Sequence, residues 1–126
     1  MPALRMKRAY LATQGLLVLA WWVSLIVAPQ LRGLFQPTDG PLAFLFAFLP
    51  PDILMVSGGS IWAALRWRTP SSPPAQVWIV AGALWFTTIY LVGLWYFAAI
   101  PATGPVLMVM ASLGTAWAVI SPLGGG

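Results

Sequence analysis

Long apolar runs alternate along the 126-residue chain with short segments rich in proline, glycine and charge. A run of about 20 apolar residues can cross a hydrocarbon core about 30 Å thick as an α-helix. The breaks between the runs hold proline, glycine and serine clusters, which end helices. This pattern predicts an all-α polytopic membrane protein in which residues 1–126 form a single membrane domain. Its four transmembrane helices, packed in one bundle, would cover about residues 10–28, 50–68, 77–98 and 104–121.

The first apolar run follows a basic leader, residues 1–9, and therefore resembles a secretory signal peptide at first sight. A signal peptide has an apolar region of about 7–15 residues, followed by small residues at the cleavage site. The run here is longer, Ile26 and Ala28 would flank the cut, and Pro29 would follow it. We therefore interpret residues 10–28 as an uncleaved first span.

The second run, residues 42–65, can be read in two ways. One kinked helix over the whole run would place Asp52 near the middle of the membrane. Alternatively, a helix begins at Pro50 and ends near Arg68, and residues 42–49 form a re-entrant or lipid-dipping lead-in. Proline is tolerated in the first turn of a helix, and a carboxylate there meets the positive end of the helix dipole. We favour this second reading.

Basic residues indicate how the chain crosses the membrane. Arg32 shares its loop with Asp39, whereas the other five basic residues would lie on the opposite face: Arg5, Lys7, Arg8, Arg66 and Arg68. Cytoplasmic loops carry the excess of lysine and arginine. We therefore expect both termini in the cytoplasm and a multi-pass location in the cell inner (plasma) membrane. Because the basic residues form short clusters beside apolar runs, we expect no nucleic-acid partner.

Composition removes most catalytic chemistry. Hydrophobic residues make up 60% of the chain and charged residues 6%, far below the roughly 25% charged residues of soluble domains. Cysteine and histidine are absent, which excludes disulfides, thiolate nucleophiles and Cys/His metal sites. Asp39 and Asp52 alone cannot build a carboxylate metal cage. We therefore expect no enzyme activity, no catalytic residue, no metal site and no cofactor.

Asp52 and Arg32 form the candidate polar site. Asp52 is the acid closest to the apolar phase, and intramembrane carboxylates usually serve a function such as proton or cation relay. The structural alternative, which we favour, is that Asp52 opens a helix at the outer interface and is held by backbone N–H groups. Arg32, on the same outer side, is the one candidate partner for an ion-coupled site.

Four small residues, Ser57, Gly58, Gly59 and Ser60, interrupt the second run. Small residues allow transmembrane helices to approach closely, so a packing face is the favoured interpretation. The alternative is a helix break that lines a substrate path, as in transporters with interrupted helices.

Eight tryptophans are present, and those near span ends (Trp67, Trp78 and Trp95) suit an interfacial aromatic belt. The deeper ones either pack against helices and lipid, which we favour, or stack on a flat apolar ligand: Trp21, Trp22, Trp62, Trp85 and Trp117.

These observations favour a non-catalytic accessory or assembly subunit that contacts membrane lipids and packs against other membrane-protein subunits or against itself. The alternative is a small oligomeric transporter or channel with Asp52 as its proton or cation site.

The two readings of the second run predict different labelling of a cysteine placed at Phe46. If the helix begins at Pro50, this cysteine reacts with a membrane-impermeant maleimide from outside the cell or at the interface. Complete protection of the cysteine, in cells where the reagent labels an external control site, would favour the single kinked span.

Overall fold

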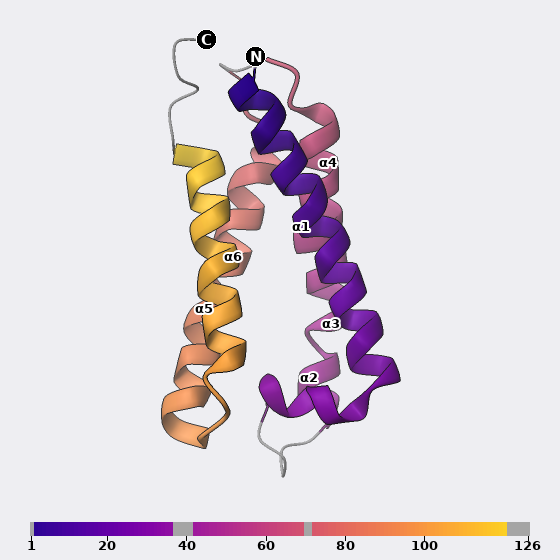
Figure 1. The fold of residues 1–126 in the computed structure, drawn as a ribbon, viewed down its shortest axis with the longest axis vertical. Helices are drawn as coiled ribbons and strands as arrows, with labels where there is room; N and C mark the ends of the chain where they lie inside the picture. Colours follow the sequence, from indigo (N-terminus) through magenta and orange to yellow (C-terminus); the bar gives the residue numbers. More distant parts are fainter. Residues whose placement is uncertain (1, 37–41, 70–71, 121–126) are drawn as a thin grey trace.

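The four apolar runs fold as long helices that pack side by side (Figure 1). The structure, a computed structural model, describes residues 2–36, 42–69 and 72–120. Within these ranges, four helical stretches are long and apolar enough to cross a membrane: residues 3–27, 43–66, 75–98 and 103–120. The predicted class, an all-α bundle of four candidate membrane spans, is confirmed. Asp39 with its turn and residue 121 of the predicted fourth span lie outside the described residues.

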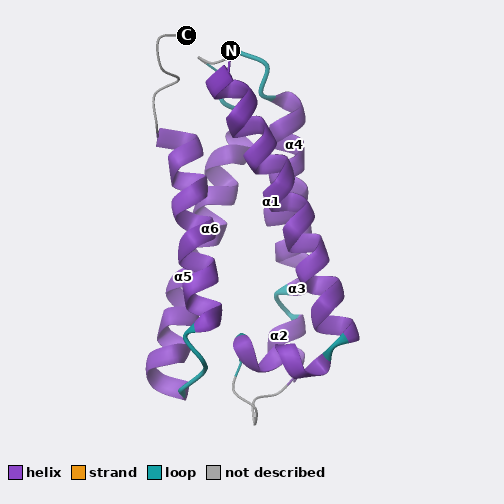
Figure 2. Cartoon of the chain, viewed as in Figure 1, coloured by secondary structure: helices purple, strands orange, loops and turns teal. Residues whose placement is uncertain are grey.

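The helices run alternately up and down the bundle. The start of α1 (Pro2–Val27), the end of α4 (Gly58–Arg66) and the end of α6 (Thr103–Ile120) lie at one end (Figure 1). The opposite end holds η1 (Pro29–Leu34), a 3₁₀ helix, and the link between α5 (Ala75–Ala98) and α6. Figure 2 shows that, in the part of the chain the structure describes, loops are confined to short connections between helices.

Basic residues from both predicted clusters meet at one end of the bundle. Arg8 Nε donates a hydrogen bond of 2.7 Å to the Ala64 carbonyl near the end of α4. Arg32, in η1, lies at the other end. The structure thus places the charges on the two ends that the chain pattern predicts. Which end faces the cytoplasm stays a prediction from the positive-inside rule.

The first helix begins at Pro2, well before the predicted start at Tyr10. The basic leader is therefore helical, and it forms part of the bundle. Lys7 is 2% exposed, and its Nζ lies 5.7 Å from the ring centroid of Trp67 and 5.8 Å from that of Trp117. Contacts of a cation with aromatic faces compensate for lost hydration. Trp67, which follows the last residue of α4, is buried and faces the bundle; its depth in a membrane stays a prediction.

The second run is divided into four pieces: α2 (Leu42–Phe46), α3 (Leu49–Pro51), η2 (Asp52–Ser57) and α4. The short α2 lies across the end of the bundle (Figure 1). From Leu49 the helix is continuous to Arg66, with two prolines in its first turn. The segment η2 is a π-helix, in which the Gly58 N–H bonds to the carbonyl of Ile53. Whether residues 42–49 cross the membrane stays a prediction.

The helices form two close pairs. Along α1 lie η2 and α4, and along α5 lies α6; α4 also packs against α5, and contact between α1 and α6 is more limited. Gly15 allows the first pair to approach, because a Cβ there would lie 2.8 Å from the Ser57 carbonyl oxygen and 2.6 Å from Ile61 Cγ1. The Ser57 hydroxyl donates a 2.7 Å hydrogen bond to the Gly15 carbonyl at the same crossing.

Replacement of Gly15 by alanine is expected to lower the free energy of unfolding by about 1–3 kcal/mol, because the new methyl group overpacks the α1–α4 crossing. Gly82→Ala on α5 is the matched control, since a Cβ there meets nothing within 4 Å. Alanine is favoured over glycine in helices by about 1 kcal/mol, so the control keeps or gains stability. Thermal unfolding in detergent measures both variants, and equal effects would contradict the tight crossing.

Candidate functional site

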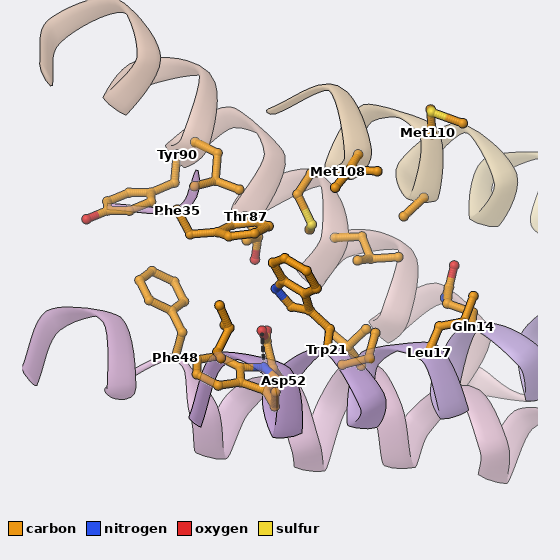
Figure 3. Close-up of a pocket in the computed structure, with 18 of the residues that line it drawn as sticks. Gln14, Leu17, Trp21, Phe35, Phe48, Asp52, Thr87, Tyr90, Met108 and Met110 are labelled. Carbon is orange, nitrogen blue, oxygen red and sulfur yellow. Dashed lines mark hydrogen bonds between the residues drawn. The ribbon is translucent and has the colours of Figure 1, made fainter. Parts of the chain in front are cut away.

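A cavity of about 720 Å³ lies between the two helix pairs. This volume falls within the range of about 300–1,000 Å³ typical of small-molecule sites. Its walls come from α1, the two residues that follow η1, α2, Phe48, η2, α5 and α6, and they are predominantly apolar. Figure 3 shows side chains from several of these elements facing the same space: Leu17, Trp21, Phe35, Phe48, Tyr90 and Met108.

A buried polar layer joins three helices beside the cavity. Its centre is Gln14 of α1, whose Oε1 accepts hydrogen bonds from Tyr10 (2.7 Å) and from Thr115 of α6 (2.9 Å). Gln14 Nε2 donates to the Ser60 hydroxyl of α4 at 3.1 Å. Gln14, Ser60 and Thr115 are all buried. The amide thus fixes the distance between the α1–α4 pair and α6 at this level.

Bulky side chains hold the pairs apart further along α1. Trp21, Trp22 and Leu25 face the cavity there, whereas the polar layer uses small partners such as Ser60 and Thr115. The Trp21 ring packs edge-on against Phe35, with centroids 5.1 Å apart. The difference in side-chain volume between the two levels explains why the helices meet at one level and enclose space at the other.

Asp52 lies on the cavity wall as the first residue of η2. Its Oδ2 accepts a hydrogen bond of 2.9 Å from the Trp22 indole N–H, drawn as a dashed line in Figure 3. The carboxylate is therefore anchored to α1 by a neutral donor from another helix, which the first-turn interpretation did not foresee. Among the described residues, Asp52 is the only acidic side chain.

Arg32 contacts the C-terminal end of α1. Its Nε donates to the Leu25 carbonyl at 2.8 Å and its Nη2 to the Ile26 carbonyl at 3.3 Å. The guanidinium also lies 5.1 Å from the ring centroid of Phe46. A cation is favourable at a helix C-terminus, where carbonyl groups lack helical partners. Arg32 thus caps α1, and the described structure does not bring it to Asp52 as an ion pair.

The small residues of the second run lie mainly at helix contacts. Ser57 bonds to α1, and Ser60 bonds to Gln14. A Cβ added to Gly59 would lie 2.9 Å from Val80 Cγ2, so Gly59 permits close contact with α5. Gly58 is exposed. None of these four residues lines the cavity, which is the arrangement expected of a packing face.

Sequence reasoning missed two glutamines. Gln14 was detectable as the one amide within the first apolar run, since such a residue needs partners in lipid. Gln36 lines the cavity, and its side-chain carbonyl oxygen is buried without a hydrogen-bond partner among the described residues. Gln36 follows η1 in a proline- and glycine-rich segment, where a polar residue carries no signal of burial.

Comparison of the chain with protein-family models, with curated protein sequences and with solved structures found no match. The geometry of the cavity and its polar groups therefore carries the functional argument.

Replacement of Gln14 by leucine is expected to destabilise the bundle by about 1–2 kcal/mol, since two interhelical hydrogen bonds are lost and each contributes on the order of 0.6 kcal/mol or more in membranes. Gln76→Leu, near the start of α5, makes the same chemical change outside the polar layer. Unfolding in detergent measures both variants. An unchanged Gln14→Leu protein would show that the layer does not hold the helices together.

Proposed function

We propose that this small four-span membrane protein is a non-catalytic accessory protein that holds the apolar part of a membrane-soluble molecule in the cavity between its helix pairs. The observation that carries the proposal is the apolar cavity itself, of about 720 Å³. An empty space of this size would forfeit the packing contacts of its walls, so a guest molecule would stabilise the arrangement.

The mouth of the cavity supports entry from the lipid. Three cavity-lining side chains are also largely exposed: Leu17 of α1 (64%), Phe44 of α2 (66%) and Met110 of α6 (64%). Their positions indicate an opening between α1 and α6. Apolar side chains at such an opening match the hydrocarbon phase, so a guest molecule can enter sideways without crossing water.

Apolar walls alone do not select a guest molecule in a membrane. Lipid chains are as apolar as leucine, so transfer from the bilayer to the cavity gains no hydrophobic free energy. Selection therefore depends on shape, aromatic contacts and the few polar groups of the wall. The wall residues with polar side chains include Asp52, Gln36, Thr87 and Tyr90, together with Tyr10, Thr13 and Gln14 toward the polar layer.

The accessory role draws support from the exposed surface as well. On α5, several exposed aromatic side chains are available to lipid or to a partner subunit: Trp78, Trp85, Phe86, Tyr96 and Phe97. The composition, with no cysteine, no histidine and two acidic residues, fits a protein that binds or presents a molecule rather than one that converts it.

Proton or cation transport is a second candidate, favoured by the position of Asp52 on the cavity wall. A transport path along the whole bundle would have to pass the level of Tyr10 and Gln14, where three hydrogen bonds link α1 to α4 and α6. These interhelical bonds favour a closed junction at this level over an open path.

The variant Thr87→Trp is expected to fill the cavity and expel its guest molecule. Thr87 lines the cavity, and among the described residues its hydroxyl bonds only to the Ala83 carbonyl of its own helix, at 2.9 Å. No interhelical hydrogen bond is lost in the exchange. Native mass spectrometry of the protein purified in mild detergent should show retained lipophilic molecules on the wild type and at least a fivefold loss of them on Thr87→Trp.

Ile89→Trp adds the same indole to the exposed side of α5 and is the matched control. It should retain the guest molecule at the wild-type level. If wild type and both variants retain the same small molecules equally, the cavity does not hold them and the proposal fails. If a second protein co-purifies in a one-to-one ratio and no small molecule is retained, a helix of that partner would occupy the cavity, which would also contradict the proposal.

A further inference from the structure

We infer that the guest molecule is a lipophilic amine, bound as its ammonium ion, with the charged nitrogen at Asp52 and the apolar body in the cavity between the helix pairs. The inference rests on the proposed cavity function and adds the chemical class of the ligand.

The first observation is a carboxylate without a cation. Asp52 receives one hydrogen bond, from the neutral indole of Trp22. Arg32 is committed to the C-terminal carbonyls of α1, and the described chain supplies no salt bridge to Asp52. A charge taken out of water is costly unless it is paired, and attraction between opposite charges is strong in a medium of low dielectric constant. A cationic ligand would supply the missing partner.

The second observation is that Asp52 keeps one acceptor oxygen unused. The hydrogen bond from Trp22 uses Oδ2 of Asp52, which leaves Oδ1 without a hydrogen bond among the described residues. An ammonium group carries N–H donors and positive charge together, so it complements this oxygen better than a neutral carbonyl or ester group does.

The third observation is the aromatic surroundings of the carboxylate. Figure 3 shows the Asp52 side chain pointing into a space bordered by Phe48 and Trp21. Tyr90 lies against Phe48, with ring centroids 5.2 Å apart, and lines the same cavity. Aromatic faces attract cations, most strongly where water is excluded. The charge of Asp52, its unused acceptor oxygen and the surrounding aromatic rings all favour a cationic ligand. The remaining apolar volume accommodates its hydrocarbon body.

The test compares dodecylamine, which is an ammonium ion at neutral pH, with dodecanol, which has the same chain and no charge. Wild-type protein in phosphatidylcholine nanodiscs is titrated with each probe, and concentrations are expressed per membrane lipid so that partitioning cancels. Trp21 and Trp22 line the cavity, so intrinsic fluorescence reports its occupation. We expect saturable binding of dodecylamine at least tenfold tighter than that of dodecanol.

The Asp52→Asn variant should remove this preference by weakening dodecylamine binding about tenfold while dodecanol binding stays unchanged. Asparagine keeps an acceptor for the Trp22 indole, so the anchor to α1 is retained. Each variant is judged by the ratio of its affinities for dodecylamine and dodecanol, because a disturbed fold would weaken the binding of both probes together.

Equal affinity of the wild type for the two probes would overturn the inference, whatever the variants show. A preference that survives in Asp52→Asn would overturn it too. Thr87→Trp tests the proposed cavity function separately: weaker binding of both probes to this variant is the expected result, because both would occupy the cavity, and amine selection is then judged from the wild type and Asp52→Asn alone. If Thr87→Trp blocks neither probe, the cavity function itself fails.

Discussion

The hydrogen bonds of Gln14 hold three helices together at one level of the bundle. The spacing of the helices in the rest of the bundle depends on that junction. Helices in lipid gain no hydrophobic free energy by leaving hydrocarbon for one another, so close packing and interhelical hydrogen bonds must hold them. Both are concentrated here, in the contacts of Gln14 with Ser60 and Thr115 and in the tight crossing at Gly15. A second link, between Thr88 and Ser112 at 2.7 Å, joins α5 to α6.

A bundle tied at one level can stay open at another. The cavity reaches the level of Gln14, and beyond it the residues of α1 that line the cavity are apolar or aromatic: Leu17, Val18, Trp21, Trp22 and Leu25. The Trp22–Asp52 hydrogen bond keeps η2 close to α1 along this wall. The same tryptophan side chain therefore does two things: it holds a carboxylate in place and contributes to the apolar wall of the cavity.

Much of the fold could be predicted from the chain pattern, because four apolar runs separated by proline-rich breaks leave few alternatives in a membrane. The start of α1 could not be predicted, because a basic leader is typical of an exposed segment. Only the fold brings Trp67 and Trp117 beside Lys7. The same limit applies to Arg32. A loop arginine on the same side as a carboxylate can pair with it or can cap the preceding helix, and only the fold decides between these partners.

The candidate site was predictable in part, and the reason lies in how residues 52–60 divide between two faces of one helical segment. Asp52 and Val56 face the cavity, while Ser57 and Ser60 face α1 and Gly59 faces α5. The small residues could be recognised as a packing face because spacing alone predicts it. The position of Asp52 on the cavity wall was harder to predict, because it begins a π-helical turn, which changes the angle between residues on either side and is frequent at functional sites. Because the packing face and the cavity face are separate, replacing Asp52 by asparagine, which keeps an acceptor for the Trp22 indole, alters the chemistry of the cavity and leaves the contacts of Ser57, Gly59 and Ser60 in place.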